Sequence, residues 1–195
     1  MKYIIRLVLL AVALFLAKML YDSIQEPLIF EEKSTERYTA AQAKMLKIKE
    51  AQLAFREGNN RFAKTFDELI RHVDTADFVL TSKRDTSYIV IDKVFKEKVE
   101  KFEILTDTLG YSSIKDSLFS SDAELKDLPI IPFTEGKTFK MKAGKLKKGS
   151  NFFPVLELKA PKSELLKGLD ERYVKMQGQD LILGSMDAVN LNGNW

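Results

Sequence analysis

The feature that most constrains this chain is an uninterrupted apolar run, Leu7–Ala17, close to its N-terminus. The run lies within Tyr3–Tyr21, which is long enough for a helix to cross the hydrocarbon core of a bilayer if Arg6 and Lys18 extend their charged ends to the two interfaces. The stretch has no polar face, so a helix buried in a soluble domain fits it poorly. We therefore predict a transmembrane anchor over residues 1–21, with residues 3–21 in contact with the membrane lipid bilayer.

A cleaved secretory signal is the alternative, because a short apolar core behind basic residues is typical of that class as well. The A-x-A sequence that such a signal needs occurs at Ala11–Ala13, inside the apolar run. Cleavage there would need a very short signal and would leave apolar residues at the new N-terminus. An uncleaved anchor is therefore the favoured interpretation, and cleavage stays open.

The charges on either side of the run predict its orientation. Lys2 and Arg6 precede it, whereas Asp22 and Glu26 follow it, with Lys18 as the contrary charge near the exit. By the positive-inside rule the N-terminus stays cytoplasmic and the body of the chain is exported. In a bacterium this describes a single-pass inner-membrane protein with a periplasmic body.

The charge balance of the body excludes one class of partner. The chain of 195 residues has 31 Lys and Arg against 28 Asp and Glu. Three of the bases and none of the acids lie in residues 1–20, so the remainder carries 28 of each. A neutral body lacks the single-sign field that nucleic acids attract, so we expect no nucleic-acid partner. The absence of cysteine excludes disulfides, thiol catalysis and thiolate zinc sites.

A second helix is predicted after the anchor, from about Glu31 to Glu57, with Pro27 expected to break or kink the chain before it. Apolar positions and one Gln follow a spacing of three and four residues in this segment: Tyr38, Ala41, Met45, Ile48, Gln52 and Phe55. Two interpretations compete, namely packing on the sheet of the same domain and packing against a partner helix. Our candidate packing residues, within the domain or across a partner, are Tyr38, Met45, Ile48 and Phe55.

Cap and turn signals divide the rest of the chain. Gly58–Asn60 resembles a left-handed helix end, and Thr65–Glu68 has the form of a capping box that starts a short helix. Phe78–Thr81 and Tyr88–Ile91 predict a hairpin with its turn at Lys83–Asp85. Further strands are expected at 102–106, 138–143, 152–158 and 181–184, and a short helix at 163–169.

This order of elements predicts an α+β fold: an N-terminal transmembrane helix, a long amphipathic helix, and then a mainly antiparallel sheet domain. We divide the chain into an anchor (1–21), a linker with the amphipathic helix (22–57), and a periplasmic α+β domain packed on that helix (58–195).

Motifs with chemistry are scarce. His72 is the only histidine and is interpreted as a surface or packing residue, because a metal site would need further ligands. The lysines of Lys137–Lys148 alternate with apolar residues and predict a solvated strand, with contact to anionic lipid or an acidic partner as the alternative. No G-x-S-x-G, G-x-G-x-x-G or P-loop sequence occurs. We therefore expect no cofactor, no metal and no enzymatic activity.

Three segments of the helical half resemble type IV pilins and type II secretion pseudopilins: 48–55 (IKEAQLAF), 58–63 (GNNRFA) and 65–69 (TFDEL). In those families an N-terminal membrane helix continues into an amphipathic half. The resemblance implies, as an alternative function, a pseudopilin-like subunit of a type II secretion or type IV pilus-like machine.

Later segments are similar to a family of single-pass envelope proteins from Bacteroidota: 115–119 (KDSLF), 131–133 (IPF), 154–160 (PVLELKA), 168–170 (GLD), 184–186 (GSM) and 192–195 (NGNW). No activity comes with this resemblance. Taken with the anchor and the helical stripe, it implies a non-enzymatic component of a cell-envelope assembly, with an envelope protein or a second copy as partner.

Overall fold

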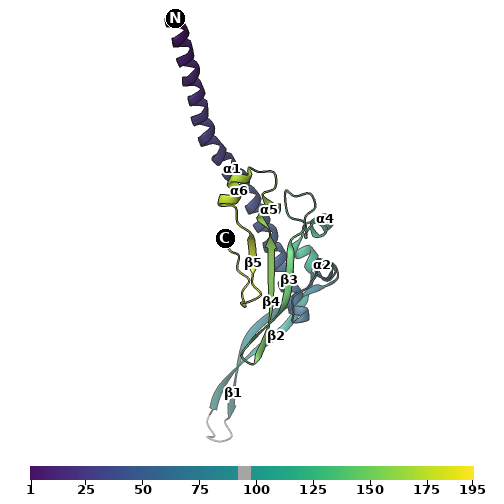
Figure 1. The fold of residues 1–195 in the computed structure, drawn as a ribbon. Coiled ribbons are helices and arrows are strands. Elements are labelled where there is room, and N and C mark those ends of the chain that lie inside the picture. Colours follow the sequence, from purple (N-terminus) through teal and green to yellow (C-terminus); the bar gives the residue numbers. More distant parts are fainter. Residues whose placement is uncertain (92–97) are drawn as a thin grey trace. The chain divides into compact units, whose positions relative to one another are not determined.

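A computed structural model describes residues 1–91 and 98–195 of the chain (Figure 1). The fold is α+β, with a long N-terminal apolar helix followed by antiparallel sheets, as the sequence predicts. The chain divides into two compact units. Unit 1 is Met1–Lys49 with Leu128–Trp195, and unit 2 is Glu50–Asp127.

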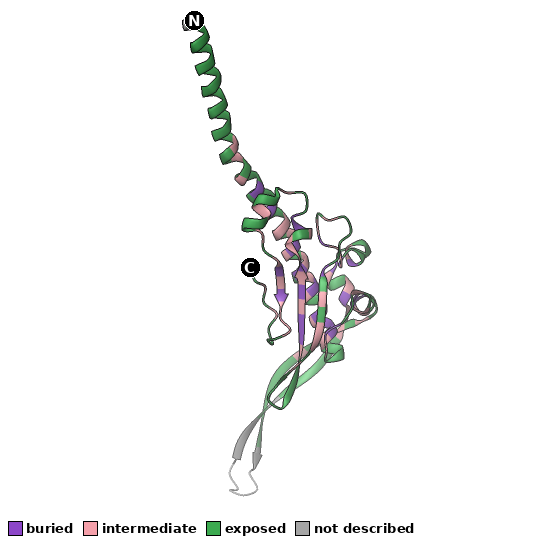
Figure 2. Ribbon diagram, in the orientation of Figure 1, coloured by how far each residue is buried: buried purple, intermediate pink, exposed green. Residues whose placement is uncertain are grey.

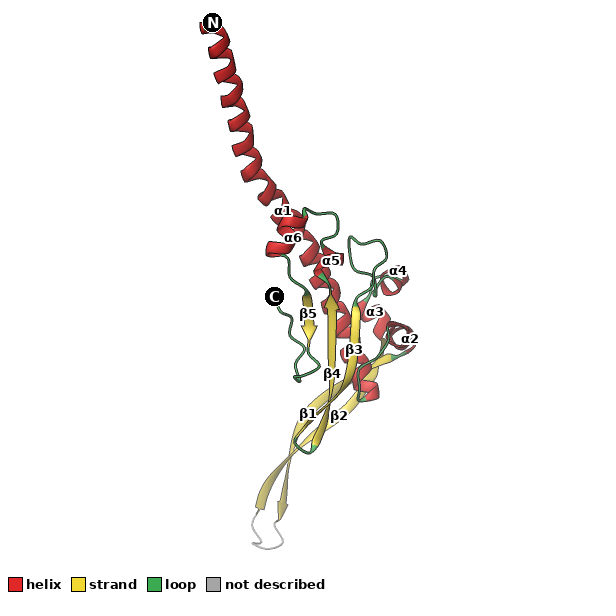
Figure 3. Cartoon of the chain, viewed as in Figure 1, coloured by secondary structure: helices red, strands yellow, loops and turns green. Residues whose placement is uncertain are grey.

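Helix α1 runs from Lys2 to Asn59 without interruption (Figure 3). Among the described residues it is the one helix long and apolar enough to cross a membrane, and none of its most apolar window is buried within the chain. The prediction of a break at Pro27 is wrong, because Pro27 lies inside the helix. Pro27 cannot donate to Ser23 four residues before it, but Ser23 is exposed, so water is available to its carbonyl.

The sheet of unit 1 contains β3 (Lys140–Lys148), β4 (Asn151–Ala160) and β5 (Leu181–Gly184), in the order β3-β4-β5 and antiparallel throughout. The pairing of Leu158 with Leu183 and of Ala160 with Leu181 places these side chains on one face, where all four are buried. Two short helices follow β4 and precede β5, namely α5 (Lys162–Leu165) and α6 (Glu171–Gln177).

The C-terminal tail continues this sheet beyond β5. Gly184 N donates to Asn192 O at 2.9 Å, and Asn194 N donates to Ile182 O at 3.0 Å. The side chain of Asn194 adds two bonds, accepting from Ile182 N at 3.0 Å and donating to Asp180 O at 2.9 Å. The edge of β5 is therefore covered by the chain's own last residues, which limits pairing with foreign strands.

Unit 2 begins with the last turns of α1 and contains α2 (Phe66–Thr75), β1 (Asp77–Ile91), β2 (Lys98–Ser113), α3 (Ile114–Leu118) and α4 (Asp122–Lys126). The predicted capping box is confirmed, since Thr65 Oγ1 accepts from Glu68 N at 3.3 Å and Glu68 Oε2 accepts from Lys64 N at 3.0 Å. Apolar side chains from the end of α1 and from α2 to α4 are buried in this unit: Ala51, Phe55, Leu69, Val73, Ile114 and Leu125.

One further prediction of local structure needs correction, and another is confirmed. The expected hairpin turn at Lys83–Asp85 is wrong, because β1 continues through these residues, paired with β2 at Thr106, Leu105 and Ile104. The segment has no Gly, Pro or Asn to impose a tight turn, so the extended pairing is sterically open to it. The predicted left-handed helix end at Gly58–Asn60 is confirmed, since α1 ends at Asn59 and Asn60 has a left-handed backbone with φ of 53°.

Candidate functional site

The four predicted packing residues lie along α1, and most of their surface is taken up by the chain itself. Met45 and Ile48 have no exposed surface, and Phe55 is buried. The Tyr38 hydroxyl donates to Gln179 O at 2.7 Å and accepts from Gln179 N at 3.0 Å. Burial raises the pKa of Tyr38 above its ordinary value. A partner helix therefore finds no exposed surface at Met45, Ile48 or Phe55.

His72 packs against an aromatic ring. Its imidazole meets Phe55 edge-on, with ring centroids 4.9 Å apart and an angle of 70° between the planes. Within residues 1–91 and 98–195, no group of three or more His, Asp and Glu side chains is placed to hold a metal ion. His72 thus occupies the position of a packing residue in unit 2.

The lysines of the basic run are exposed on both faces of β3. Because alternate residues of a strand point to opposite sides, Lys140 and Lys142 lie on one face and Lys145 and Lys147 on the other. The Nζ atom of Lys142 is 3.9 Å from a carboxylate oxygen of Glu157 on β4. The run is thereby divided between two surfaces instead of forming one cationic patch.

Sequence reasoning overlooked one motif, the S-x-x-K spacing of Ser112 and Lys115. In the structure Ser112 Oγ lies 3.2 Å from Ser117 Oγ. Lys115 Nζ instead contacts the carboxylates of Asp74 at 2.8 Å and Asp122 at 2.6 Å. The lysine is thus engaged by two acids and is not paired with the serine as a base would be.

Strands β1 and β2 of unit 2 form a two-stranded antiparallel ribbon. Strands β1 and β2 pair from Asp77 opposite Ser113 to Ile91 opposite Lys98, with one register shift after Leu80. In the part of the chain that the structure describes, this sheet has these two strands alone. Each strand consequently has one edge without a strand partner, and such edges pair readily with further strands.

The register of the ribbon places three strongly exposed apolar side chains on one of its faces, while Tyr88 and Leu105, 45% and 48% exposed, lie on the other. Ser87 faces Phe102, Asp85 faces Ile104, and Ile89 lies two residues further along β1, so the three apolar residues share one side. Their exposed fractions are 68% for Ile89, 77% for Phe102 and 63% for Ile104, and Figure 2 shows the described part of the ribbon as exposed. We call Ile89, Phe102 and Ile104 the apolar ribbon face.

Such a face is costly in water. An isolated two-stranded hairpin is marginally stable at best, because it lacks a covered apolar face. Contiguous patches of exposed apolar side chains on a folded protein often mark interaction surfaces. The apolar ribbon face is therefore the candidate functional site, suited to bind a protein partner by side-chain burial or by addition of a strand.

The base of the ribbon is held by hydrogen bonds from the helices around it. Ile114 N donates to Ala76 O at 3.2 Å, which joins the residues that follow β2 to those that precede β1. The two carboxylates raise the pKa of Lys115, chiefly through the hydrogen bond to Asp122, and Lys115 lowers the pKa of Asp122. Residues of α2, α3 and α4 are thus linked through one ammonium group.

The fold and the site define an α+β protein with one N-terminal helix able to span a membrane and an exposed apolar ribbon in its body. The comparisons with protein-family models, curated proteins and solved structures found no match to this chain.

Proposed function

We propose that this protein is a non-enzymatic single-pass inner-membrane protein that presents a periplasmic domain to a partner in a cell-envelope assembly. The apolar ribbon face is the observation that carries the proposal, because exposed Phe and Ile side chains on a two-stranded ribbon gain most by being covered. The partner is an envelope protein or a second copy of this chain.

The anchor supports the membrane part of this proposal. The first turns of α1 are exposed and apolar all round, which is what a helix surrounded by lipid requires. The basic residues before the run and the acidic residues after it favour export of the body. Since the chain has no cysteine, a single introduced thiol can report on which side the body lies.

Labelling of Ser150→Cys in intact cells tests the orientation. Ser150 is exposed in the turn between β3 and β4. A membrane-impermeant maleimide should label the variant after outer-membrane permeabilisation, and the cysteine-free parent supplies the background. Labelling only after lysis of the inner membrane would contradict a periplasmic body.

The partner is tested with two substitutions at neighbouring positions of β2. Ile104→Glu places a charge on the apolar ribbon face, whereas Leu105→Glu places the same charge on the opposite face. Cross-linking in membranes followed by affinity purification should recover a partner with wild type and Leu105→Glu. Ile104→Glu should lose it, because burying an unpaired carboxylate is strongly unfavourable.

Equal recovery with both variants would show that this face is not the contact surface. The assembly proposal would be wrong if wild-type membranes gave neither a partner nor a dimer and the protein behaved as a lone monomer in detergent.

A pseudopilin-like role is the second candidate, and the continuity of α1 favours it. The apolar anchor and the packed segment around Met45 belong to one helix, which is the arrangement expected from the resemblance to pilins. Residues 1–20 contain no Gly and no Glu, the two residues by which prepilins are processed and assembled. N-terminal sequencing decides the matter, since an intact Met1 would argue against processing by prepilin peptidase.

A further inference from the structure

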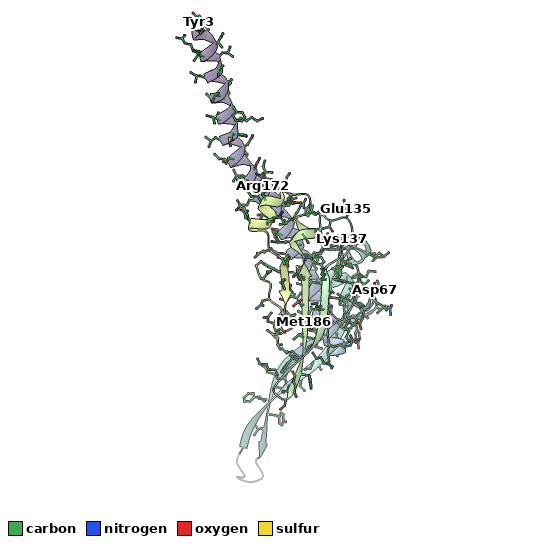
Figure 4. All side chains as sticks on the ribbon, in the orientation of Figure 1. Tyr3, Asp67, Glu135, Lys137, Arg172 and Met186 are labelled. Carbon is green, nitrogen blue, oxygen red and sulfur yellow. The ribbon has the colours of Figure 1, made fainter. Side chains whose placement is uncertain are left out.

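A pocket in unit 1 lies where α6 meets α1. Arg172 Nη2 donates to Glu26 Oε2 at 3.0 Å, and the rings of Phe30 and Tyr173 lie 5.4 Å apart between centroids. Arg172 projects from α6 beside α1 (Figure 4). These contacts leave a pocket of about 570 Å³ along α1, on the N-terminal side of the contact between the two helices. This volume lies within the range of small-ligand sites.

The groups that line the pocket change in character along α1. Phe15 and Met19 form its apolar end, Lys18 lies beside them, and Asp22 and Glu26 follow one and two turns later. Arg172 closes the far end, where its guanidinium also donates to Asp170 Oδ2 at 2.6 Å. The pocket therefore presents apolar side chains, then a cation, then carboxylates.

The pocket stands at the level of lipid headgroups, given the anchor proposed above. A helix rises about 1.5 Å per residue, so Glu26 is about 12 Å beyond Lys18 along the axis. If Lys18 marks the edge of the hydrocarbon core, the polar layer of that leaflet, about 5–8 Å thick, lies beside Asp22 and Ser23. Phe15 and Met19 then face acyl chains.

We propose that this pocket binds one phospholipid with a phosphate and a primary ammonium in its headgroup, phosphatidylethanolamine. The order of groups in that lipid, acyl chain, phosphate and ammonium, matches the order of Phe15, Lys18 and Asp22 along the helix. Lys18 binds the phosphate, and the ammonium donates to Asp22. This inference rests on the membrane anchor of the proposed function.

Charge and donors distinguish this lipid from others. An anionic lipid such as phosphatidylglycerol brings no cation for Asp22, so its phosphate would approach that carboxylate with no headgroup ammonium between them, whereas Glu26 is already paired with Arg172. Phosphatidylcholine has a cation, but its quaternary nitrogen has no N–H to donate. A primary ammonium supplies three donors, and hydrogen bonds between charged groups are the strong ones.

Native mass spectrometry of the full chain, released from detergent with equal amounts of the three lipids, tests the proposal. Wild type should keep more phosphatidylethanolamine than phosphatidylcholine or phosphatidylglycerol of the same acyl chains. Asp22→Asn should reduce that preference by about tenfold, the value of one charge-assisted hydrogen bond, and it leaves the Arg172–Glu26 pair in place.

The control is Glu31→Gln, an exposed carboxylate on the same helix outside the pocket, which should keep the wild-type preference. Circular dichroism of both variants should match wild type. An unchanged preference in Asp22→Asn, or a wild-type preference for phosphatidylglycerol, would overturn the site. Equal binding of water-soluble glycerophosphoethanolamine would assign the pocket to a free ester and overturn the lipid.

Flotation with vesicles of phosphatidylethanolamine and phosphatidylcholine separates this proposal from the anchor itself. Wild type and Asp22→Asn should both float. A wild-type chain that stays at the bottom of the gradient would overturn the anchor and the headgroup site together. A chain that floats without a headgroup preference would overturn the site alone.

Discussion

Gln52 and Ala63 are joined by a reciprocal pair of hydrogen bonds: Gln52 Nε2 donates to Ala63 O at 3.2 Å, and Ala63 N donates to Gln52 Oε1 at 2.9 Å. Both residues are fully buried. The Gln52 side chain thus satisfies the N–H and C=O groups of Ala63, which are buried in the segment between α1 and α2. A polar residue in the middle of an apolar stripe is explained by this pairing.

Replacement of Gln52 by Leu should destabilise the protein by about 2–5 kcal/mol, because it leaves a buried N–H and a buried C=O of Ala63 unpaired. Gln42→Leu, at a half-buried position of the same helix, should change stability by less than about 1 kcal/mol. Thermal unfolding of the full chain in detergent, followed by circular dichroism, measures both. Equal midpoints for the two variants would contradict the role of the amide.

Gly184 and Gly149 provide a matched pair of left-handed glycines, with φ of 77° and 64°. An added Cβ at Gly184 would clash with the carbonyl oxygen of Leu156, whereas one at Gly149 would meet nothing within 4 Å. Gly149→Ala should cost about 1–2 kcal/mol for the backbone conformation alone. Gly184→Ala should cost clearly more, since β4 and β5 must separate to admit the methyl group. Similar unfolding midpoints would refute this close approach.

Acid should weaken the link between Lys115 and Asp122. Because Lys115 lowers the pKa of Asp122, the unfolded chain takes up a proton at this carboxylate before the folded chain does. The stability that this ion pair contributes is present above the pKa of an aspartate in the unfolded chain, about 3.9. It is lost as the pH falls through the lower pKa of Asp122 in the folded chain. Asp122→Asn should therefore flatten the fall of the unfolding midpoint as the pH decreases below about 5.

The Lys115→Met variant checks the cause of that pH dependence. It should flatten the same acid limb, and Asp122→Asn should add nothing further in its background, as expected for two residues of one network. Additive effects of the two substitutions on the midpoint would show that the carboxylate and the ammonium act separately.

The C-terminal tail should contribute measurably to the sheet of unit 1. Asn194→Ala removes two hydrogen bonds to the backbone around β5 and should cost about 1–2 kcal/mol. Asn192→Ala should cost less, because the bond from Gly184 N reaches the backbone of Asn192 and survives the change. Hydrogen exchange at Ile182 N reports directly on the bond to Asn194, and unchanged protection there in Asn194→Ala would contradict it.

Local signals allowed much of the fold to be predicted. The apolar run, the Thr65–Glu68 box and the last strand each depend on residues close together in sequence, and β5 spans the residues expected for it. The helices α3, α4 and α6 were missed, because each has only five to seven residues and no full period of apolar positions. The predicted break at Pro27 does not occur because the helix-propensity penalty of proline, about 3 kcal/mol, is small beside the packing along the rest of α1.

The candidate surfaces could not be predicted in the same way. The apolar ribbon face exists because Ser87 and Asp85 are in register with Phe102 and Ile104, and no local pattern specifies that register. The pocket beside α1 depends on Arg172 meeting Glu26 across 146 positions of sequence. The sequence does contain one clue, the alternation of Phe102 and Ile104 with Lys101 and Glu103, which is typical of a strand with one apolar side.

If residues 3–21 span a bilayer as proposed, the continuity of α1 joins that bilayer mechanically to unit 1. A helix rises about 1.5 Å per residue, so Ile48 lies about 40 Å along the axis from Tyr21. A change of about 10° in the tilt of the membrane segment would move that point sideways by about 7 Å if the helix stayed straight. One helical hydrogen bond is missing at Pro27, and proline is the commonest position at which a long helix bends. Under the proposed anchor, bilayer thickness and load on unit 1 would therefore be coupled through α1.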